Sequence, residues 1–347
     1  MWRVGANLLH HALGVRLGRA PLGRPLFAYL YLTYRCDLGC SYCDDGTGKP
    51  YSERPSQELD TAGMLRLLSL LRRDTDGLIL TGGEPLMRAD LEPILEHALG
   101  LGFYPIVLYT NGHELHRRLG VLRQAHIVMI SLDTLDLGKA DAIFGRGPGV
   151  ARQIRRNIEH AAALQRTLGF ELYFNICITP QTLDDVDGVL AYARELGVGF
   201  SVLPMLRAAH VAAELGHSPR YRALLGRIIE LKRRGAPIMG TLPYLEGIRE
   251  LGRFRCVPRL LLRVKPDGHL LYPCNKLERE AGSLIELGSA AAAEQHAIAQ
   301  HGEPECVAAR CHDSCYMDLS LCAARPSLLL QEGYYRVKGL LSRAVRP

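Results

Sequence analysis

Apolar and polar positions follow two periods between residues 26 and 240. Short apolar runs, typical of strands buried on both faces, alternate with longer segments whose apolar residues recur every three or four positions, as on one face of a helix. The apolar runs predict strands over 26–35, 77–80, 104–109, 127–132, 170–178 and 198–203. The helical pattern predicts helices over 61–73, 91–99, 114–123, 150–168, 183–196 and 221–234. Repeated strand–helix units imply an α/β fold with a parallel sheet.

The first residues form a separate segment with a helical pattern over 2–18. The chain has no acidic residue before Asp37, and after Asp318 it has five basic residues against Glu332 alone. A basic amphipathic helix with a Trp can lie in a membrane interface, and it can equally cover an edge of the core. The apolar face of this expected helix carries Trp2, Ala6, Leu9, Leu13 and Leu17.

Composition limits the class of protein. The 347 residues carry a net charge of +6 and are 48% hydrophobic, which is ordinary for a globular protein. No apolar run is long enough to cross a bilayer and no secretory signal is visible, so we expect a cytoplasmic protein. Aromatic and basic residues are interleaved too sparsely to favour a nucleic-acid partner. Nine of the ten cysteines fall in two groups with metal-like spacing, which favours a metalloprotein over a disulfide-bonded one.

The first cysteine group leaves the carboxyl end of the first expected strand. Cys36, Cys40 and Cys43 follow one another at spacings of four and three residues. Three thiols without a local fourth suggest a cubane iron–sulfur cluster that keeps one iron open for another ligand. Half of a zinc knuckle, or a chance cluster, is the alternative from these residues alone.

Polar motifs also follow other expected strands. In parallel α/β folds, ligands bind at the carboxyl ends of the strands. Gly82 and Gly83 permit close approach of the backbone, and Glu84 offers an acceptor for an ammonium group. The remaining candidates are Ser131 and Asp133 at the end of the fourth strand, and Asn175 in the fifth, which is either a satisfied core amide or a ligand contact.

These motifs together resemble those of the radical S-adenosylmethionine (SAM) superfamily. The cysteine triplet, with Tyr42 before its last member, resembles the family signature, and the Gly82–Pro85 turn is similar to the family's GGEP motif. The resemblance covers about residues 27–205 and implies a partial (β/α)6 barrel. It implies that a [4Fe–4S] cluster on the three cysteines binds SAM through its open iron. Reductive cleavage of SAM would then give a 5′-deoxyadenosyl radical that abstracts hydrogen from a substrate.

The resemblance also assigns residues to SAM. It implies that the glycines and Glu84 bind the amino group, that Ser131 and Asp133 bind the ribose, and that Tyr42 contacts adenine through its backbone. Asn175 is a further expected contact. Arg146 resembles an arginine that many relatives carry after the fourth strand, with a role toward the SAM carboxylate or the substrate. A solvated loop arginine is the alternative for Arg146.

A second cysteine group begins near residue 250. The pattern over 264–274 predicts a hairpin with its turn at Asp267 and Gly268. The group resembles the SPASM/twitch extensions, which hold auxiliary iron–sulfur clusters, but it has six cysteines where the full pattern has seven. One auxiliary cluster fits most easily, a second would need an open iron or His312 as ligand, and zinc is the alternative. The six cysteines are Cys256, Cys274, Cys306, Cys311, Cys315 and Cys322.

The sequence therefore predicts a radical SAM enzyme in four parts. These are a basic amphipathic segment (1–26), the partial barrel (27–240), a small Cys-rich SPASM/twitch-like domain (241–325) and a basic C-terminal tail (326–347). A peptide or protein is the first expected substrate, although the segment before the barrel is short for a leader-binding domain. A lipid or isoprenoid at the membrane surface is the second, and a small metabolite the third. We expect a reductant such as flavodoxin or ferredoxin. A non-enzymatic iron–sulfur carrier is disfavoured, because a carrier needs no SAM site.

Overall fold

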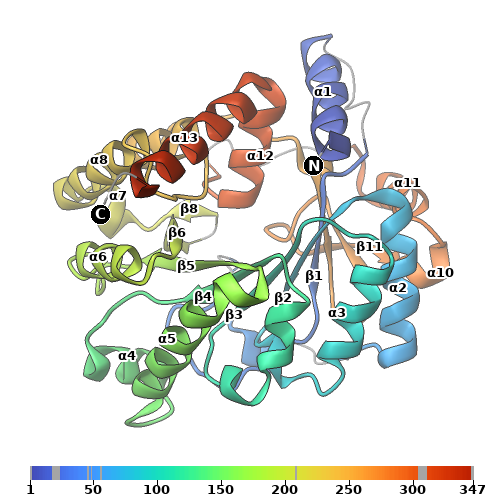
Figure 1. The fold of residues 1–347 in the computed structure, drawn as a ribbon. Coiled ribbons are helices and arrows are strands. Elements are labelled where there is room, and N and C mark those ends of the chain that lie inside the picture. Colours follow the sequence, from blue (N-terminus) through green and yellow to red (C-terminus); the bar gives the residue numbers. More distant parts are fainter. Residues whose placement is uncertain are drawn as a thin grey trace.

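The computed structural model describes residues 2–17, 24–44, 47, 49–54, 57–207, 209–303 and 311–344. Its centre is a nine-stranded sheet in the order β11-β10-β9-β1-β2-β3-β4-β5-β6 (Figure 1). The strands are β1 (Phe27–Tyr31), β2 (Gly77–Thr81), β3 (Ile106–Thr110), β4 (Ile127–Ser131), β5 (Glu171–Ile178), β6 (Gly199–Pro204), β9 (Leu261–Val264), β10 (His269–Tyr272) and β11 (Arg279–Ser283). A separate hairpin pairs β7 (Leu206–Arg207) with β8 (His210–Val211).

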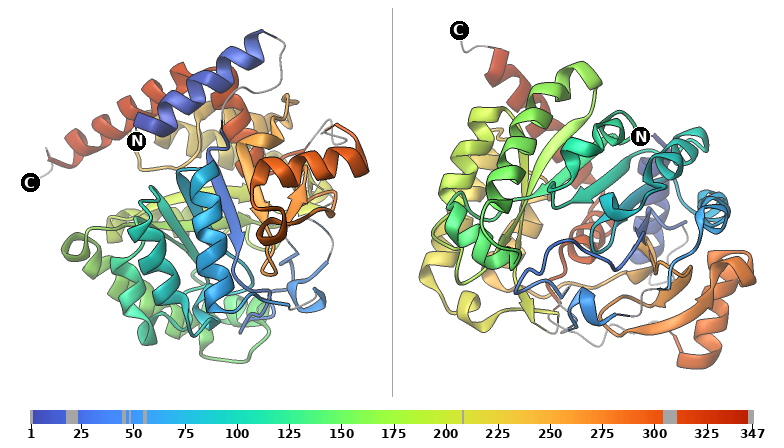
Figure 2. Two further views of the ribbon diagram at one scale, coloured as in Figure 1. Left: turned by 90° about the vertical axis from the view of Figure 1, so that its right-hand side faces the viewer. Right: turned by 90° about the horizontal axis from the view of Figure 1, so that it is seen from below.

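Helices lie mainly on the outer side of the curved sheet (Figures 1 and 2). The α-helices are α1 (Trp2–Arg16), α2 (Thr61–Asp74), α3 (Leu91–Gly100), α4 (Leu137–Phe144), α5 (Val150–Leu168), α6 (Val186–Leu196), α7 (Ala213–Gly216), α8 (Pro219–Arg233), α9 (Leu242–Glu250), α10 (Leu284–Leu287), α11 (Ala290–His301), α12 (Ser314–Ala324) and α13 (Ser327–Ala344). Single 3-10 turns are η1 (Tyr51–Glu53), η2 (Pro85–Met87), η3 (Leu115–Arg117), η4 (Leu119–Arg123) and η5 (Pro258–Leu260). Among the described helices, none is both long and apolar enough to cross a membrane.

Strands β1 to β6 run parallel in chain order, which confirms the predicted partial barrel. Side chains alternate between the two faces of each strand. Leu30, Leu80 and Leu108 are fully buried in the core that includes the outer helices. Their neighbours Tyr29 and Tyr109 belong to a second cluster on the inner side. This inner cluster is apolar and aromatic, with Ile79, Val107 and Met129 among its buried members, as the lining of a ligand site usually is.

The C-terminal region continues the barrel sheet. Strand β9 pairs parallel with β1, from Phe27 opposite Leu261 to Leu30 opposite Val264. The predicted hairpin is confirmed, because β10 pairs antiparallel with β9. The sheet therefore contains strands from both sides of the boundary that was expected near residue 240.

The predicted helix over 114–123 is wrong. The structure has the two 3-10 turns η3 and η4 there. Gly120 lies within the segment and weakens a continuous helix, and an added Cβ would lie 3.3 Å from a carboxylate oxygen of Glu92.

The apolar stripe expected on the first helix, which can lie in a membrane interface or cover an edge of the core, is not the stripe that packs on the protein. Helix α1 buries Leu8, His11 and Ala12, whereas Leu9 and Leu13 are more than half exposed. The buried face packs beside α12, and His11 Nε2 lies 2.7 Å from the carbonyl oxygen of Arg24. The helix has apolar residues on both sides, and packing on α12 buries the side that carries Leu8 and Ala12.

The expected C-terminal tail is largely the helix α13, and it is anchored on the barrel. Lys232, on α8, is 1% exposed. Its Nζ donates to Glu332 Oε2 at 2.6 Å and to the carbonyl oxygen of Ile238 at 2.9 Å. An added Cβ on Gly339 would lie 2.3 Å from the carbonyl oxygen of Gly235, so the two backbones touch.

The ion pair between Lys232 and Glu332 gives a stability prediction. Glu332→Ala should lower the free energy of unfolding by about 3 kcal/mol, because it leaves a buried ammonium without its counter-charge. Urea unfolding followed by circular dichroism measures this. The control is Glu230→Ala, which removes the exposed 2.9 Å pair with Arg234 and should cost less than about 1 kcal/mol. Equal losses in the two variants would contradict the anchoring role.

Candidate active site

A cavity of about 270 Å3 lies at the carboxyl ends of the barrel strands. It collects most of the residues that the sequence predicted for the cluster and for SAM, and it reaches the C-terminal region. The predicted residues that line it are Cys36, Cys40, Tyr42, Cys43, Gly82, Gly83, Ser131, Asp133, Asn175, His312 and Cys315.

The cysteine loop is held from two sides. Its Gly39 amide donates to the carbonyl oxygen of Phe144, at the end of α4, at 2.8 Å. Asn111 Nδ2, beyond the end of β3, lies 3.9 Å from Cys36 Sγ and 2.8 Å from Asp37 Oδ1. Asn111 was not predicted; its only sequence signal was the polar turn after the third strand.

Two of the three thiols, Cys36 and Cys40, are strongly desolvated. Burial raises the pKa of Cys36 to about 11, and burial with the neighbouring thiols raises the pKa of Cys40 well above its usual value. Thiols in such surroundings become ligands when a cation supplies the missing positive charge. Three cysteines around one cavity therefore suit a [4Fe–4S] cluster with one open iron.

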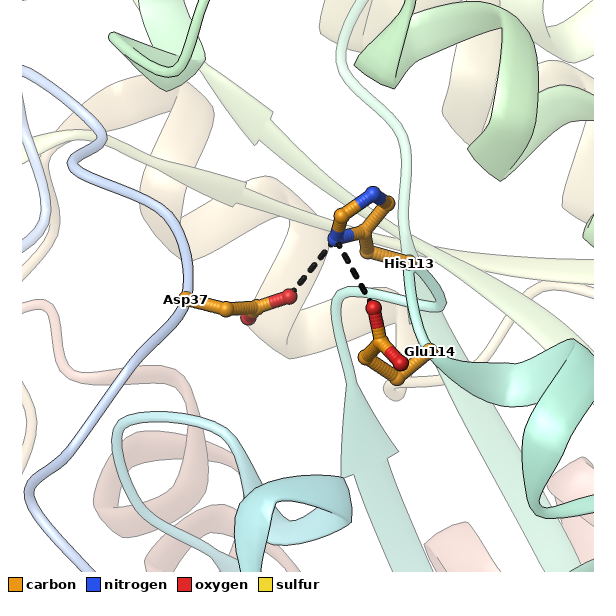
Figure 3. A group of neighbouring side chains, drawn as sticks. All are labelled: Asp37, His113 and Glu114. Atoms are coloured by element: carbon orange, nitrogen blue, oxygen red, sulfur yellow. Dashed lines mark hydrogen bonds and ion pairs between the residues drawn. The ribbon is translucent and has the colours of Figure 1, made fainter.

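Asp37, His113 and Glu114 are the one described trio of His, Cys, Asp or Glu whose ligand atoms all lie within 4.8 Å of one another. Figure 3 shows His113 Nδ1 between the two carboxylates, 2.7 Å from Asp37 and 3.7 Å from Glu114. Glu114 is also paired with Arg117 at 2.9 Å. We interpret the trio as a hydrogen-bonded brace that fixes the cysteine loop against the end of β3.

Gly82 and Gly83 are required by the protein's own backbone. Gly82 has φ +145°, and an added Cβ would lie 2.2 Å from the carbonyl oxygen of Thr33. A Cβ on Gly83 would lie 2.2 Å from the carbonyl oxygen of Arg35. The segment that leads into the cysteine loop therefore crosses directly over this turn.

Glu84 has a different placement from the one expected. Its carboxylate is fully buried and does not line the cavity. It accepts hydrogen bonds from Thr110 Oγ1 at 2.8 Å, from the Asn111 amide at 2.6 Å and from the Leu86 amide at 2.9 Å. Burial outweighs these bonds and raises the pKa of Glu84 to about 7. Glu84 thus joins the turns after β2 and β3.

The β4 and β5 ends bring three predicted residues together. Ser131 pairs with Asn175 across the two strands, and both line the cavity. Asp133 accepts a hydrogen bond from the Tyr42 hydroxyl and another from the Cys177 amide at 2.7 Å. Burial raises the pKa of Asp133 to about 7. Tyr42 therefore also ties the cysteine loop to β4 through its side chain.

Arg146 is not brought to this site. It lies in the exposed turn after α4 and does not line the cavity. Its alternative interpretation, a solvated loop arginine, agrees with this placement.

The inner wall of the cavity contains an ion pair that the sequence analysis missed. Arg263, on β9, is 2% exposed, and its guanidinium lies 4.3 Å from the Tyr29 ring centre and 5.1 Å from that of Tyr316. Its Nη2 lies 3.2 Å from both carboxylate oxygens of Asp313. Burial would raise the pKa of Asp313, but Arg263 and Lys276 hold it below its usual range. In the sequence, the sign of this buried ion pair was one charged residue, Arg263, within the apolar segment 260–264.

Four C-terminal cysteines lie near this ion pair, and one of them, Cys315, lines the cavity. Cys256, Cys274 and Cys315 pack against the cluster that contains Tyr316, and Cys311 Sγ accepts a hydrogen bond from the Asp313 amide at 3.4 Å. His312 is 3% exposed, and its two ring nitrogens have no hydrogen-bond partner in the described structure. Burial lowers the pKa of His312.

Two further cysteines stand apart from this set. Cys322 packs in another apolar cluster with Leu8 and Leu26, so the prediction that it shares a metal with the others is not supported by its position. Cys322 lies on α12 among apolar residues, and this position explains why it is separated from the other cysteines. Cys306 lies outside the described residues.

Fold and cavity define a partial-barrel protein with three cysteines around a cavity at the carboxyl ends of its strands. A family model described as the radical SAM superfamily matches residues 30–204, about half of the chain, and the chain belongs to that superfamily. The predicted enzyme class and its cofactors, a [4Fe–4S] cluster and SAM, follow from this membership.

Two curated relatives each match about half of the chain or less. The PqqA peptide cyclase of Xanthomonas axonopodis pv. citri (strain 306) is 32% identical over 175 residues, which is 49% of this chain and 45% of that protein. The molybdenum cofactor biosynthesis protein 1 of Mus musculus is 41% identical over 119 residues, 33% of this chain and 19% of that one. The match therefore spans less than half of these relatives.

Solved structures share the fold over more of the chain. Streptococcus suis SuiB bound to precursor peptide SuiA has a TM-score of 0.57 at 16% identity and covers 76% of this chain and 64% of its own. The anSMEcpe structure with bound AdoMet has a TM-score of 0.57 at 15% identity and covers 89% of this chain and 99% of its own.

The close backbone crossing at Gly82 gives a second stability prediction. Gly82→Ala should destabilise the protein by at least about 3 kcal/mol, because the added Cβ meets a backbone oxygen that cannot move freely. The control is Gly102→Ala, since Gly102 has φ +76° but open space around its Cβ position. It should cost only about 1 kcal/mol. Urea unfolding compares the two, and similar losses would show that the crossing is unimportant.

The buried Glu84 gives a pH prediction. Its pKa is about 7 in the folded protein against an ordinary 4.5. At a pH between these two values, Glu84 keeps its proton in the folded state and releases it in the unfolded state. The free energy of unfolding therefore falls as the pH rises, by up to about 1.4 kcal/mol per pH unit. Urea unfolding at about pH 5 and about pH 7 should show this loss relative to Glu84→Gln, which has no proton to release. The same pH slope in both proteins would contradict it.

Proposed function

We propose that this chain reductively cleaves SAM and abstracts hydrogen from a peptide or protein substrate. The observation that carries the proposal is the single cavity shared by the three loop cysteines, the strand-end residues and the C-terminal wall. A reaction between a cofactor and a second molecule needs both at one place with water excluded.

Cys36, Cys40 and Cys43 would hold the [4Fe–4S] cluster. When bound and reduced, this group supplies the electron that cleaves SAM to a 5′-deoxyadenosyl radical. The chain's own part is to fix the loop through Asn111 and the brace of Asp37, His113 and Glu114. An external one-electron donor such as flavodoxin or ferredoxin would supply the reductant.

SAM would lie along the ends of β2, β4 and β5. The backbone of Gly82 and Gly83, the hydroxyl of Ser131 and the amide of Asn175 all line the cavity and could contact it. Asp133 and Tyr42 would form the adjoining wall as a hydrogen-bonded pair. Glu84 would act as a positioning residue that holds the two neighbouring turns.

Cys256, Cys274, Cys311 and Cys315 would hold one auxiliary iron–sulfur cluster. Three of these thiols pack around Tyr316 and the fourth contacts the Asp313 amide, and four thiols are enough to ligate all irons of a cubane. His312 would then stay neutral and unligated. Electron transfer or structural support would be the role of a cluster with no open iron.

The substrate would enter between the SAM residues and the wall of Arg263, Lys276 and Asp313. Peptides appear in the names of similar proteins: a peptide cyclase, a structure bound to a precursor peptide, and anSMEcpe structures with peptides. These names favour a peptide over the lipid and metabolite alternatives.

The test is production of 5′-deoxyadenosine by the reconstituted, dithionite-reduced chain. Cys40→Ala should abolish it, a loss of more than about a hundredfold, because the cluster loses one of three ligands. Auxiliary cluster absorbance should remain. The matched control is Cys322→Ala, which should keep both iron and activity.

Peptides encoded beside the gene for this chain are the first substrates to try. Mass spectrometry would detect modification, and a true substrate should accelerate SAM cleavage. If the reconstituted wild-type protein keeps its clusters but forms no 5′-deoxyadenosine, the proposed enzymatic activity is refuted. Stimulation by lipid extract or a metabolite pool, and by no peptide, would refute the substrate class.

A further inference from the structure

Exposed large apolar side chains are concentrated at the two terminal helices. Among the described residues, eight such side chains are exposed, and seven belong to α1, the turn after it, or α13. The most exposed are Leu330 at 79%, Leu9 at 60% and Tyr334 at 60%. The full set on the two helices is Leu9, Leu13, Leu17, Leu329, Leu330, Tyr334 and Val337. We call these seven residues the terminal-helix face.

Each helix is fixed to the protein by its other side. Helix α1 packs beside α12 through Leu8, His11 and Ala12. Helix α13 is held by the ion pair of Glu332 with the buried Lys232. The exposed residues repeat every three or four positions, so each helix presents one continuous apolar stripe outward.

The two helices lie on the same side of the molecule. Figure 1 shows α1 and α13 at the top of the view, and the turned view in Figure 2 agrees. This side holds the amino ends of the barrel strands: Arg336 of α13 is paired with Glu171, the first residue of β5. The eighth exposed apolar residue, Tyr104, precedes β3 at this end. The cysteine loop and the cavity lie at the opposite ends of the strands.

The charge of both segments is positive. The sequence of α1 contains two arginines and no acid. That of α13 contains Arg336, Lys338 and Arg343 against Glu332. Glu332 pairs with Lys232, and Arg336 pairs with Glu171. The remaining positive charge of this segment is that of Lys338 and Arg343. A second copy of the chain would bring like charges together, whereas anionic lipid would attract them. Apolar stripes flanked by basic residues are the features of helices that lie in a bilayer interface.

We propose that the terminal-helix face docks on the surface of an anionic lipid bilayer, with α1 and α13 lying in the interface. The cavity then faces away from the membrane and stays open to a substrate from the aqueous side. This docking is independent of the reaction and of the substrate class.

The experiment is co-sedimentation of the full, anaerobically reconstituted chain with vesicles. One set contains equal parts of phosphatidylglycerol and phosphatidylcholine, and the other phosphatidylcholine alone. The wild type should bind the anionic vesicles, and binding should weaken with added salt. The double variant Leu13→Glu/Leu330→Glu should lower the partition coefficient at least about tenfold. Both positions are exposed, so circular dichroism should stay unchanged.

A matched control adds the same two charges elsewhere. Ala142→Glu/Ala191→Glu changes exposed residues of α4 and α6, away from the terminal-helix face, and should bind like the wild type. No binding of the wild type, or equal losses in both double variants, would overturn the proposal. The proposal would also be overturned if the wild type bound no vesicles but formed a dimer that Leu13→Glu/Leu330→Glu dissociates. Light scattering without vesicles would detect this dimer. That result would assign the face to self-association.

Discussion

The crossing of residues 33–35 over the turn at Gly82 and Gly83 is the contact on which the site depends. The amides of Gly83 and Glu84 donate to the carbonyl oxygens of Thr33 and Arg35, both at 2.8 Å. Only glycine fits beneath this crossing, because any Cβ would meet a carbonyl oxygen. The cysteine loop begins at the next residue, so the crossing fixes where the metal ligands start. Buried Glu84 then couples the same turn to β3.

Buried charge inside the barrel is a second constraint. Glu84, Arg263 and Asp313 are buried, and hydrogen bonds or ion pairs hold each of them, while the half-buried Asp133 accepts a hydrogen bond from the Cys177 amide. Apolar side chains of similar size would usually stabilise such an interior more. Asp133, Arg263 and Asp313 line the cavity and Glu84 lies behind it, an arrangement typical of a site where geometry is maintained at a cost in stability.

The C-terminal region completes the cavity instead of forming a separate unit. Strand β9 extends the barrel sheet beside β1, and its Arg263 projects between Tyr29 of the barrel and Tyr316 of α12. The residues proposed for SAM and those proposed for the auxiliary cluster therefore share one wall. Helix α12 also supports α1 and α13, so the termini and the site depend on the same element.

The sequence by itself determined the strand–helix alternation, the cysteine triplet and the turn motifs, because periodicity and local motifs encode them directly. It could not determine which stripe of α1 is buried, because both stripes are apolar and only packing on α12 distinguishes them. The sequence also could not show that Cys322 packs apart from the other cysteines, that Arg146 lies outside the cavity, or that Glu84 accepts a hydrogen bond from Thr110. Those placements depend on residues far apart in the chain, and only the tertiary structure brings such residues together.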